Sequence, residues 1–448
     1  MMDHYRMADT SQIKNWYLSL FRDFENHLNG EKSVPLHKLR KEAIDKFAEL
    51  DFPNLHQEDW RFTDVSPILK HTFTYANRKS SPVPDKKEIS KFLFGGMRSH
   101  LLVFVNGFYS AELSTILPLP KGVIIGSLAG AIKDNDGTVN ENISKYAAFN
   151  DNVFTALNTA FTIDGAYIYI PDKVIIEDPV HILFISHGIE KFISQPRNLI
   201  IAGKSSQVKI IEHYESVDAG VYFTNSVTEI HAGENSVVDA TKVQSENLDA
   251  YHVATTEVSL DANSNYESHS ISLGADIYRH NLNVALRGEG SSTALEGLYL
   301  LSGNQLSDTH SLIDHASPRC TSQEHYKGIL DGKSRGVFNG KIMVRKGAQQ
   351  TNSYQENRNI ILSDEAKVDT KPQLEIFADD VKCSHGATVG QLSKESMFYL
   401  RSRGISEEQA KLILIYAFAN DVLKGIKIDE VRSQLENILS ERFLNNSR

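Results

Sequence analysis

The chain has 448 residues, of which 41% are hydrophobic and 23% charged, the composition of an ordinary globular protein. Its net charge of -10 argues against a nucleic-acid partner, which would favour a basic face. The longest apolar run, 412–419, is too short to cross a membrane, and no apolar signal-like segment follows Met1. Two cysteines are too few for a disulfide framework. We therefore expect a cytoplasmic protein with no membrane or nucleic-acid partner.

The first part of the chain, residues 1–97, is predicted to be a helical region that ends in a linker. Apolar residues recur at helical spacing in two stretches: Trp16, Leu20, Phe21 and Phe24, then Leu36, Leu39, Ala43, Ile44 and Phe47. Gly30 suits a helix stop, and Pro35 suits the first turn of the next helix. Residues 76–88 are polar and contain prolines, which is typical of a linker.

Residues 98–390 change to short β runs such as LLVFVNG, AYIYI and VKIIEHYE. Turn-like clusters recur at intervals of roughly 25–30 residues, a spacing found in repeat architectures. These clusters lie at Gly203, Gly233, Asn263, Gly288, Ala316 and Gly347. Strands and turns at this spacing, without intervening helices, predict the coils of a β-helix. A β-sandwich is the competing interpretation, but its turn signals usually come about every 8–12 residues.

Residues 391–448 are predicted to be helical again. Ser393 can cap a helix that ends at Gly404, and Ser406 with Gln409 forms a capping-box pattern that opens the next helix. The second helix is nearly apolar over 410–419, so this face is either core or a docking surface for a partner.

The segment VKCSHGATVG contains the most informative pair of side chains. On a strand, Cys383 and His385 are two residues apart and project from the same face. A thiolate beside an imidazole suits iron, zinc or Fe–S ligation. Fe–S clusters commonly have four protein ligands, so further ligands would come from elsewhere, including a second chain. A small buried cysteine beside a hydrogen-bonded core histidine would show the same spacing.

The other cysteine lies in a segment with three histidines. His310, His315, Cys320 and His325 follow one another at five-residue steps, a spacing that matches no zinc signature. On strands these steps place successive donors on alternating faces, so structural histidines and a packing or accessory cysteine are favoured over a metal site.

Phosphate-binding motifs are incomplete in this sequence. The AGKSS string at 202–206 resembles the end of a P-loop, but Asn198 occupies the position of the leading glycine. The FNGKI string at 338–342 fails in the same way. We therefore expect no ATPase activity from this chain. The HQEDWRFTD segment at 56–64 is either a recognition element or an aromatic anchor for the helical region.

Three long strings together resemble the SufB/SufD family of the Suf iron–sulfur assembly system, and within it the SufD branch. They are SDEAKVDTKPQLEIFADDVKCSHGATVGQL with FYLRSRGIS over 363–406, DHASPRCTSQEHYKGILDGKSRGVFNGKI over 314–342, and EDWRFTD over 58–64. The resemblance spans nearly the whole chain and is most specific over 314–406. The two cysteines and the intact KCSHGAT string favour SufD over SufB. Phe377 stands where the family often has tyrosine.

The resemblance implies a right-handed parallel β-helix between two helical regions, in a mainly β protein. It implies pairing with a SufB-like paralogue through the β-helix, and docking of a SufC-like ABC ATPase through the C-terminal helices. It places a nascent Fe–S cluster at the paralogue interface, with His385 and its neighbour Cys383 as candidate ligands. It assigns no role to Cys320. ATP hydrolysis would belong to the partner, so the chain itself would be a non-catalytic scaffold.

Two other classes of function remain open at this point. The chain could be a purely structural partner that binds no metal, or a β-helix carbohydrate-active enzyme, although no catalytic carboxylate cluster is evident. Because a β-helix without large polar caps leaves strand edges free, we also expect the isolated chain to form a homodimer through its β region.

Overall fold

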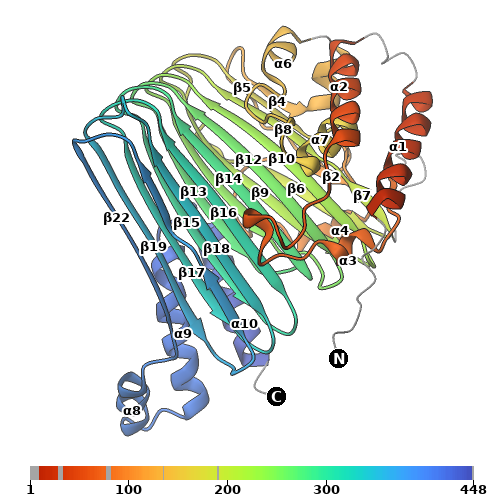
Figure 1. The fold of residues 1–448 in the computed structure, drawn as a ribbon. Helices are drawn as coiled ribbons and strands as arrows, with labels where there is room; N and C mark the ends of the chain where they lie inside the picture. Colours follow the sequence, from red (N-terminus) through yellow and green to blue (C-terminus); the bar gives the residue numbers. More distant parts are fainter. Residues whose placement is uncertain (1–9, 29–33, 77–81, 135, 189–190, 446–448) are drawn as a thin grey trace.

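The computed structural model describes residues 10–28, 34–76, 82–134, 136–188 and 191–445. Within them, two long sheets form the walls of a β-solenoid, and from β8 onward each coil contributes a strand first to one sheet and then to the other (Figure 1). Sheet A contains, in spatial order, β20 (Lys367–Thr370), β18 (Arg335–Val344), β16 (Leu306–His315), β14 (Ile277–Leu286), β12 (Tyr251–Leu260), β10 (Phe223–Ala232), β8 (Arg197–Ala202), β5 (Ala166–Ile170) and β4 (Ile124–Ser127), with β21 (Gln373–Ile376) beside β18 and β7 (Phe192–Ser194) between β10 and β1 (Thr74–Tyr75). Sheet B contains β22 (Val381–Gly390), β19 (Thr351–Ile361), β17 (Thr321–Leu330), β15 (Ser292–Leu301), β13 (Asn265–Ser272), β11 (Val237–Gln244), β9 (Gln207–Val217), β6 (Val180–His187), β2 (His100–Val105) and β3 (Phe108–Tyr109).

The strand pairing confirms the predicted parallel β-helix. Apart from β2–β3 and β4–β5, the named strands pair in parallel. Leu306 on β16 pairs with Arg335 on β18, which is 29 residues further along the chain, so one coil has about the predicted length. The predicted turn clusters also fall at equivalent places: Gly233 follows β10, Gly288 follows β14 and Gly347 follows β18, each before a strand of sheet B.

The residues at the end of successive turns stack on one another and form a buried column. Ser206, Ser236, Ser264 and Ser291 occupy this position in successive coils, and Cys320 occupies it in the next coil, all with no exposed surface. The Cys320 Sγ lies 3.4 Å from the Ser291 Oγ and donates to the Gly288 carbonyl at 3.4 Å. Cys320 is therefore a packing residue that replaces a serine in the column.

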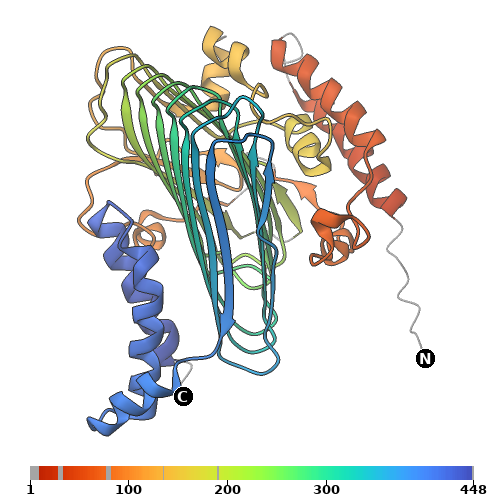
Figure 2. The ribbon, with the colours of Figure 1, turned by 60° about the vertical axis from the view of Figure 1, so that its left-hand side comes forward.

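Helices of the N-terminal half cover the outer face of sheet A (Figures 1 and 2). They are α1 (Thr10–His27), α2 (Pro35–Glu49) and α7 (Val153–Ala160), with the short elements η2 (Glu58–Trp60), α3 (Ser66–Leu69), α5 (Leu128–Lys133) and α6 (Gly137–Asn142). The short helix α4 (Lys86–Ser90) instead packs Ile89 against sheet B. Helix α2 begins at Pro35 as predicted. The predicted helix stop at Gly30 and part of the predicted linker lie outside the described residues.

The expectation that no helix interrupts the β region is wrong between residues 128 and 160. Helices α5, α6 and α7 are there, and each begins with a side-chain cap. The Asn152 side chain, for example, accepts hydrogen bonds from the backbone N–H groups of Phe154 and Thr155. Helix α7 has eight residues, all buried, and its polar residues Thr155, Asn158 and Thr159 bond inside the molecule. This stretch is shorter than the window of about 11–18 residues over which helical periodicity is recognised.

The C-terminal helices lie on the opposite side of the solenoid, against sheet B (Figure 2). They are α8 (Lys394–Ser402), α9 (Glu407–Leu423) and α10 (Asp429–Asn445). The predicted caps are present: the Ser393 and Ser406 side chains accept hydrogen bonds from backbone N–H groups at the start of α8 and α9. Helices α9 and α10 bury apolar side chains against the sheet, whereas α8 has no buried residue. No helix in the described part of the chain has the length and apolarity needed to cross a membrane.

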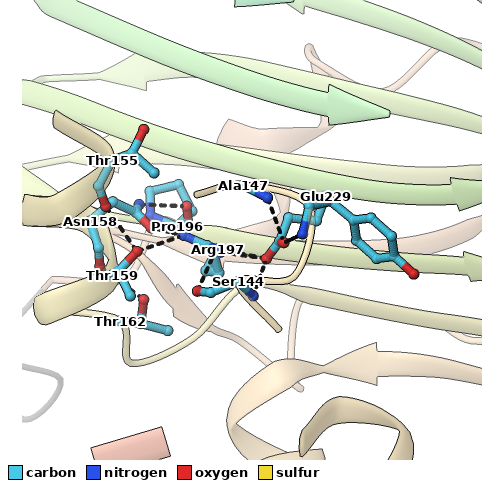
Figure 3. A network of polar contacts seen from close by, with 10 residues as sticks. Ser144, Ala147, Thr155, Asn158, Thr159, Thr162, Pro196, Arg197 and Glu229 are labelled. Carbon is cyan, nitrogen blue, oxygen red and sulfur yellow. Dashed lines mark hydrogen bonds and ion pairs between the residues drawn. The ribbon is translucent and has the colours of Figure 1, made fainter. Parts of the chain in front are cut away.

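A buried ion pair joins the N-terminal helices to the solenoid (Figure 3). Arg197 on β8 donates to the Glu229 carboxylate on β10 at 2.6 Å and to the Thr159 hydroxyl of α7 at 3.0 Å. Glu229 also accepts from the backbone N–H groups of Ser144 at 2.8 Å and Ala147 at 2.9 Å. Both charged side chains are completely buried, so each depends on the other and on these hydrogen bonds.

We expect Arg197→Met to lower the free energy of unfolding by about 3–5 kcal/mol, because it leaves the Glu229 carboxylate buried without its cation. The matched control is Lys333→Met, which removes a surface pair with Glu365 whose side chains are 68% and 62% exposed. That change should cost about 1 kcal/mol or less. Urea unfolding of both variants tests the difference, and equal losses would contradict the anchoring role of Arg197.

Candidate functional site

The C-terminal end of the solenoid is open. Strand β22 is the last strand of sheet B, while β20 and β21 end sheet A, and in the described residues each pairs with a neighbour on one side only. Every residue of β22 is at least partly exposed, whereas the preceding strand, β19, buries every second residue. The free backbone groups of such edges can pair with another chain.

Cys383 and His385 point into the solenoid interior at this open end. Cys383 pairs in register with Ser353 and His385 with Gln355, and both residues of β19 are buried on its inner side. Residues in register on stacked parallel strands face the same way, so the sequence-predicted pair lies on one face of one strand. Cys383 also packs against the apolar cluster that includes Ile342, while His385 is exposed.

The surroundings of Cys383 keep its thiol protonated. Burial raises the pKa of the Cys383 thiol, and a hydrogen bond from the Ser353 backbone opposes this effect. A metal that binds here must therefore displace the thiol proton. The described residues contain no cluster of three or more metal-ligating side chains. The Cys383–His385 pair can therefore supply two soft or borderline ligands, and a complete site needs others.

A layer of buried polar side chains lies directly beneath this pair. We call Ser353, Gln355, Asn357 and Asn359 the polar floor; they are the inward-facing residues of β19 and are at most 3% exposed. Sequence reasoning missed them. The sequence did contain a signal for them. The coil spacing predicts a strand at the TNSYQENRN stretch, and this stretch is polar at both its inward-facing and its outward-facing positions.

Two hydrogen-bonded columns run through the floor. Beneath Cys383, the Ser353 and Ser322 hydroxyls are 2.6 Å apart, and Ser322 is 2.9 Å from His315 Nε2. Beneath His385, the Gln355 Nε2 donates to Glu324 Oε2 at 2.6 Å. The two candidate ligands therefore lie over polar side chains, whereas the same two columns contain apolar residues such as Val238 and Leu295 in earlier coils.

The residues of the second cysteine segment do not come together. His310 lies on the outer face of sheet A near Asp308, His315 points into the interior, and His325 lies on the outer face of sheet B near Glu356. Cys320 is in the buried turn column. The four donors are therefore scattered, as their five-residue spacing predicted.

The EDWRFTD segment anchors the N-terminal region to sheet A. The Trp60 ring lies 5.6 Å from Phe154 and stacks under the Arg279 guanidinium at 4.3 Å. Thr63 donates a hydrogen bond to Asp308, and Glu58 pairs with Lys371. These contacts support the anchor interpretation of the segment.

One buried constellation has the side chains of a hydrolytic triad. The Ser226 hydroxyl is 3.0 Å from His252 Nε2, and His252 Nδ1 is 2.6 Å from Glu246 Oε2. All three residues are at most 3% exposed, and they lie inside the solenoid. A substrate cannot reach this serine in the packed interior, so the network stabilises the fold.

Helix α8 carries the most exposed aromatic side chains of the C-terminal region. Phe398 is 75% exposed and Tyr399 is 57% exposed. They project from a helix that stands clear of the solenoid (Figure 2). Large apolar side chains exposed in this way are typical of protein–protein interaction sites.

Comparisons with known proteins cover almost the whole chain. The family model described as SUF system FeS cluster assembly, SufBD core domain, matches residues 184–418, and that of the SufBD protein N-terminal region matches residues 11–182. An iron–sulfur cluster assembly SufBD family protein of Synechocystis is 35% identical over 92% of this chain and 92% of its own length. The iron–sulfur cluster assembly protein SufD of Escherichia coli is 28% identical over 94% and 97%. Protein ABCI7, chloroplastic, of Arabidopsis thaliana is 29% identical over 96% and 91%.

Because Glu324 is buried, we predict that the free energy of unfolding depends on pH. Burial raises its pKa to about 7, above the value of about 4.3 for an unfolded glutamate. Between these values the folded state binds more protons than the unfolded state, so this group's contribution to stability falls as pH rises. Glu324→Gln removes this loss. As pH rises from 4 to 8, the free energy of unfolding of Glu324→Gln should therefore increase by roughly 3 kcal/mol relative to that of the native protein.

The measured quantity is the slope of unfolding free energy against pH, because any constant cost of the new amide cancels from it. The control is Glu365→Gln at a side chain that is 62% exposed, whose profile should run parallel to that of the native protein. Parallel profiles for Glu324→Gln as well would show that Glu324 titrates normally.

Proposed function

The chain belongs to the SufBD family of iron–sulfur cluster assembly proteins, and we propose on that premise that it is a SufD-like scaffold subunit on which a nascent cluster forms. The observation that carries this proposal is the placement of Cys383 and His385, which share one face of the edge strand at the open end of the solenoid. The cluster is cargo in this proposal, and catalysis of ATP hydrolysis is assigned to a partner.

A SufB-like paralogue is the proposed partner at the open end. The free edges of β20, β21 and β22 offer backbone hydrogen bonds, and exposed apolar side chains surround them. Phe377 is 64% exposed, Val389 48% and Ile376 39%. A second β-helix stacked there would continue both sheets, cover these side chains and supply further ligands to the cluster. Without the paralogue, a second copy of this chain could occupy the same end as a homodimer.

A SufC-like ABC ATPase is the proposed partner of the C-terminal helices. Helix α8 presents Phe398 and Tyr399 to solvent, while α9 and α10 fix its position by packing on sheet B. The sequence has no complete phosphate-binding loop of its own. The cytoplasmic location expected from the sequence stays a prediction.

The chemistry of the two candidate ligands favours His385 as the more important one. A neutral imidazole can bind iron without adding negative charge to the site, and His385 is exposed at the open end. Cys383 is partly buried, and its raised pKa opposes thiolate formation. It can serve as a neighbouring ligand once iron displaces its proton.

We expect His385→Ala to impair cluster formation more than Cys383→Ala does. Both variants should stay folded, because a truncation in a solenoid disturbs mainly the adjacent coils. The measurement is iron and sulfide content after anaerobic reconstitution of the complex isolated through a tag on this chain, with circular dichroism alongside. Full cluster content in both folded variants would instead support a purely structural subunit that binds no metal.

We also expect the double substitution Phe398→Ser with Tyr399→Ser to abolish co-purification of the ATPase while the solenoid stays folded. Deleting 391–448 is a poorer test, because α9 and α10 cover an apolar part of sheet B that would then be exposed. The control is Ile175→Ser, which removes an apolar side chain that is 54% exposed elsewhere on the solenoid. Unchanged ATPase recovery with the double variant would rule out α8 as the docking element.

A further inference from the structure

Gln355 lies directly below His385 in the interior of the solenoid. The two residues pair in register on β19 and β22, and Gln355 is completely buried. Its amide has one polar partner, Glu324 on the coil below, to which Nε2 donates at 2.6 Å. On the opposite sheet, a Cβ at Gly340 would lie 2.2 Å from this Nε2, so the glycine provides the space that the amide occupies.

This arrangement leaves a free acceptor under the histidine. The Gln355 Oε1 is buried and has no hydrogen-bond partner among the described residues. A buried acceptor without a partner is unfavourable, so a donor that approaches it is stabilised. Because Nε2 is held by Glu324, the carbonyl oxygen is the end of the amide that remains available. Neighbouring strands lie about 4.8 Å apart, a distance over which a side chain of one coil reaches the next.

We propose that Gln355 is the positioning residue of His385: its Oε1 accepts the N–H of one imidazole nitrogen, and the other nitrogen then faces the open end as a ligand for iron. This inference rests on the proposed function and deepens it. A histidine that binds a metal usually donates its second ring N–H to an oxygen acceptor, which fixes the tautomer and the ring orientation. In this chain Glu324 holds the acceptor in place from below.

The polar floor contains a matched control for this role. Asn357 is also a buried amide on the inner side of β19, but its register partner on β22 is Ala387, which has no ligating group. Asn357 donates to the Tyr299 hydroxyl at 3.2 Å and to the Tyr326 carbonyl at 3.3 Å. Replacing it disturbs the same layer of the interior without removing an acceptor from beneath the histidine.

The test uses ferrous iron as the probe and the complex isolated through a tag on the full chain. The anaerobic iron dissociation constant is measured for the native complex and for Gln355→Leu, Gln355→Glu, Asn357→Leu and His385→Ala. We expect Gln355→Leu to weaken iron binding about 10–100-fold, as is common when the hydrogen-bond partner of a metal-binding histidine is removed. Gln355→Glu keeps an oxygen acceptor at this position and should restore most of the affinity, while Asn357→Leu should bind iron like the native complex.

The possible outcomes distinguish a failure of this inference from a failure of the proposed function. If His385→Ala weakens iron binding but Gln355→Leu does not, the function stands and the positioning role of Gln355 is overturned. An equal loss in Gln355→Leu and Asn357→Leu, or a Gln355→Glu variant as weak as Gln355→Leu, also overturns it, since either result reports general damage to the floor. If His385→Ala binds iron normally, both the ligand assignment and the inference fail.

Discussion

The in-register stacking of parallel coils is the constraint on which the rest of this structure depends. Each inward-facing side chain must fit the residues above and below it, so the interior is built in columns that run along the solenoid. Small residues appear where a neighbour is large: a Cβ at Gly297 would lie 2.0 Å from the Tyr326 ring, and one at Gly328 would lie 2.1 Å from the Tyr299 ring. A change at one position is therefore felt in the adjacent coils and much less beyond them.

The same stacking explains the change along the two columns that end at Cys383 and His385. In earlier coils these columns contain apolar residues such as Val238 and Leu295, which satisfy one another by contact. In the last coils Ser353 and Gln355 take their places, and each polar side chain of the interior needs a hydrogen-bond partner. Asn359, for example, donates to Asn357 at 2.6 Å and accepts from the Tyr299 hydroxyl. The column of His385 is different, because the Gln355 Oε1 beneath it has no partner among the described residues.

Much of the fold could be predicted from the sequence because a solenoid repeats its turn signals once in each coil. The helices α2, α8 and α9 were predictable for a different reason, since Pro35, Ser393 and Ser406 mark their first turns. Helix α7 was missed because its eight residues are fewer than the window of about 11–18 over which helical periodicity is recognised. Cys383 and His385 could be placed on one strand face by their spacing alone. The polar floor could not be tied to them, because it lies about 30 residues away in sequence and only the register of the coils brings it beneath them.

Strand β17 contacts both the interior at the open end and helix α9, two regions to which the proposed function gives different roles. Its inward-facing Glu324 supports Gln355 below the open end, and three residues later the outward-facing Lys327 reaches helix α9. The Lys327 ammonium donates to the Asp421 carboxylate at 2.6 Å and to the Phe418 carbonyl at 2.9 Å, and its side chain is 1% exposed. One side of this strand thus contacts the interior beneath the candidate ligands, and the other side contacts helix α9. Because protein interiors are close-packed, β17 is a direct physical connection between the two regions.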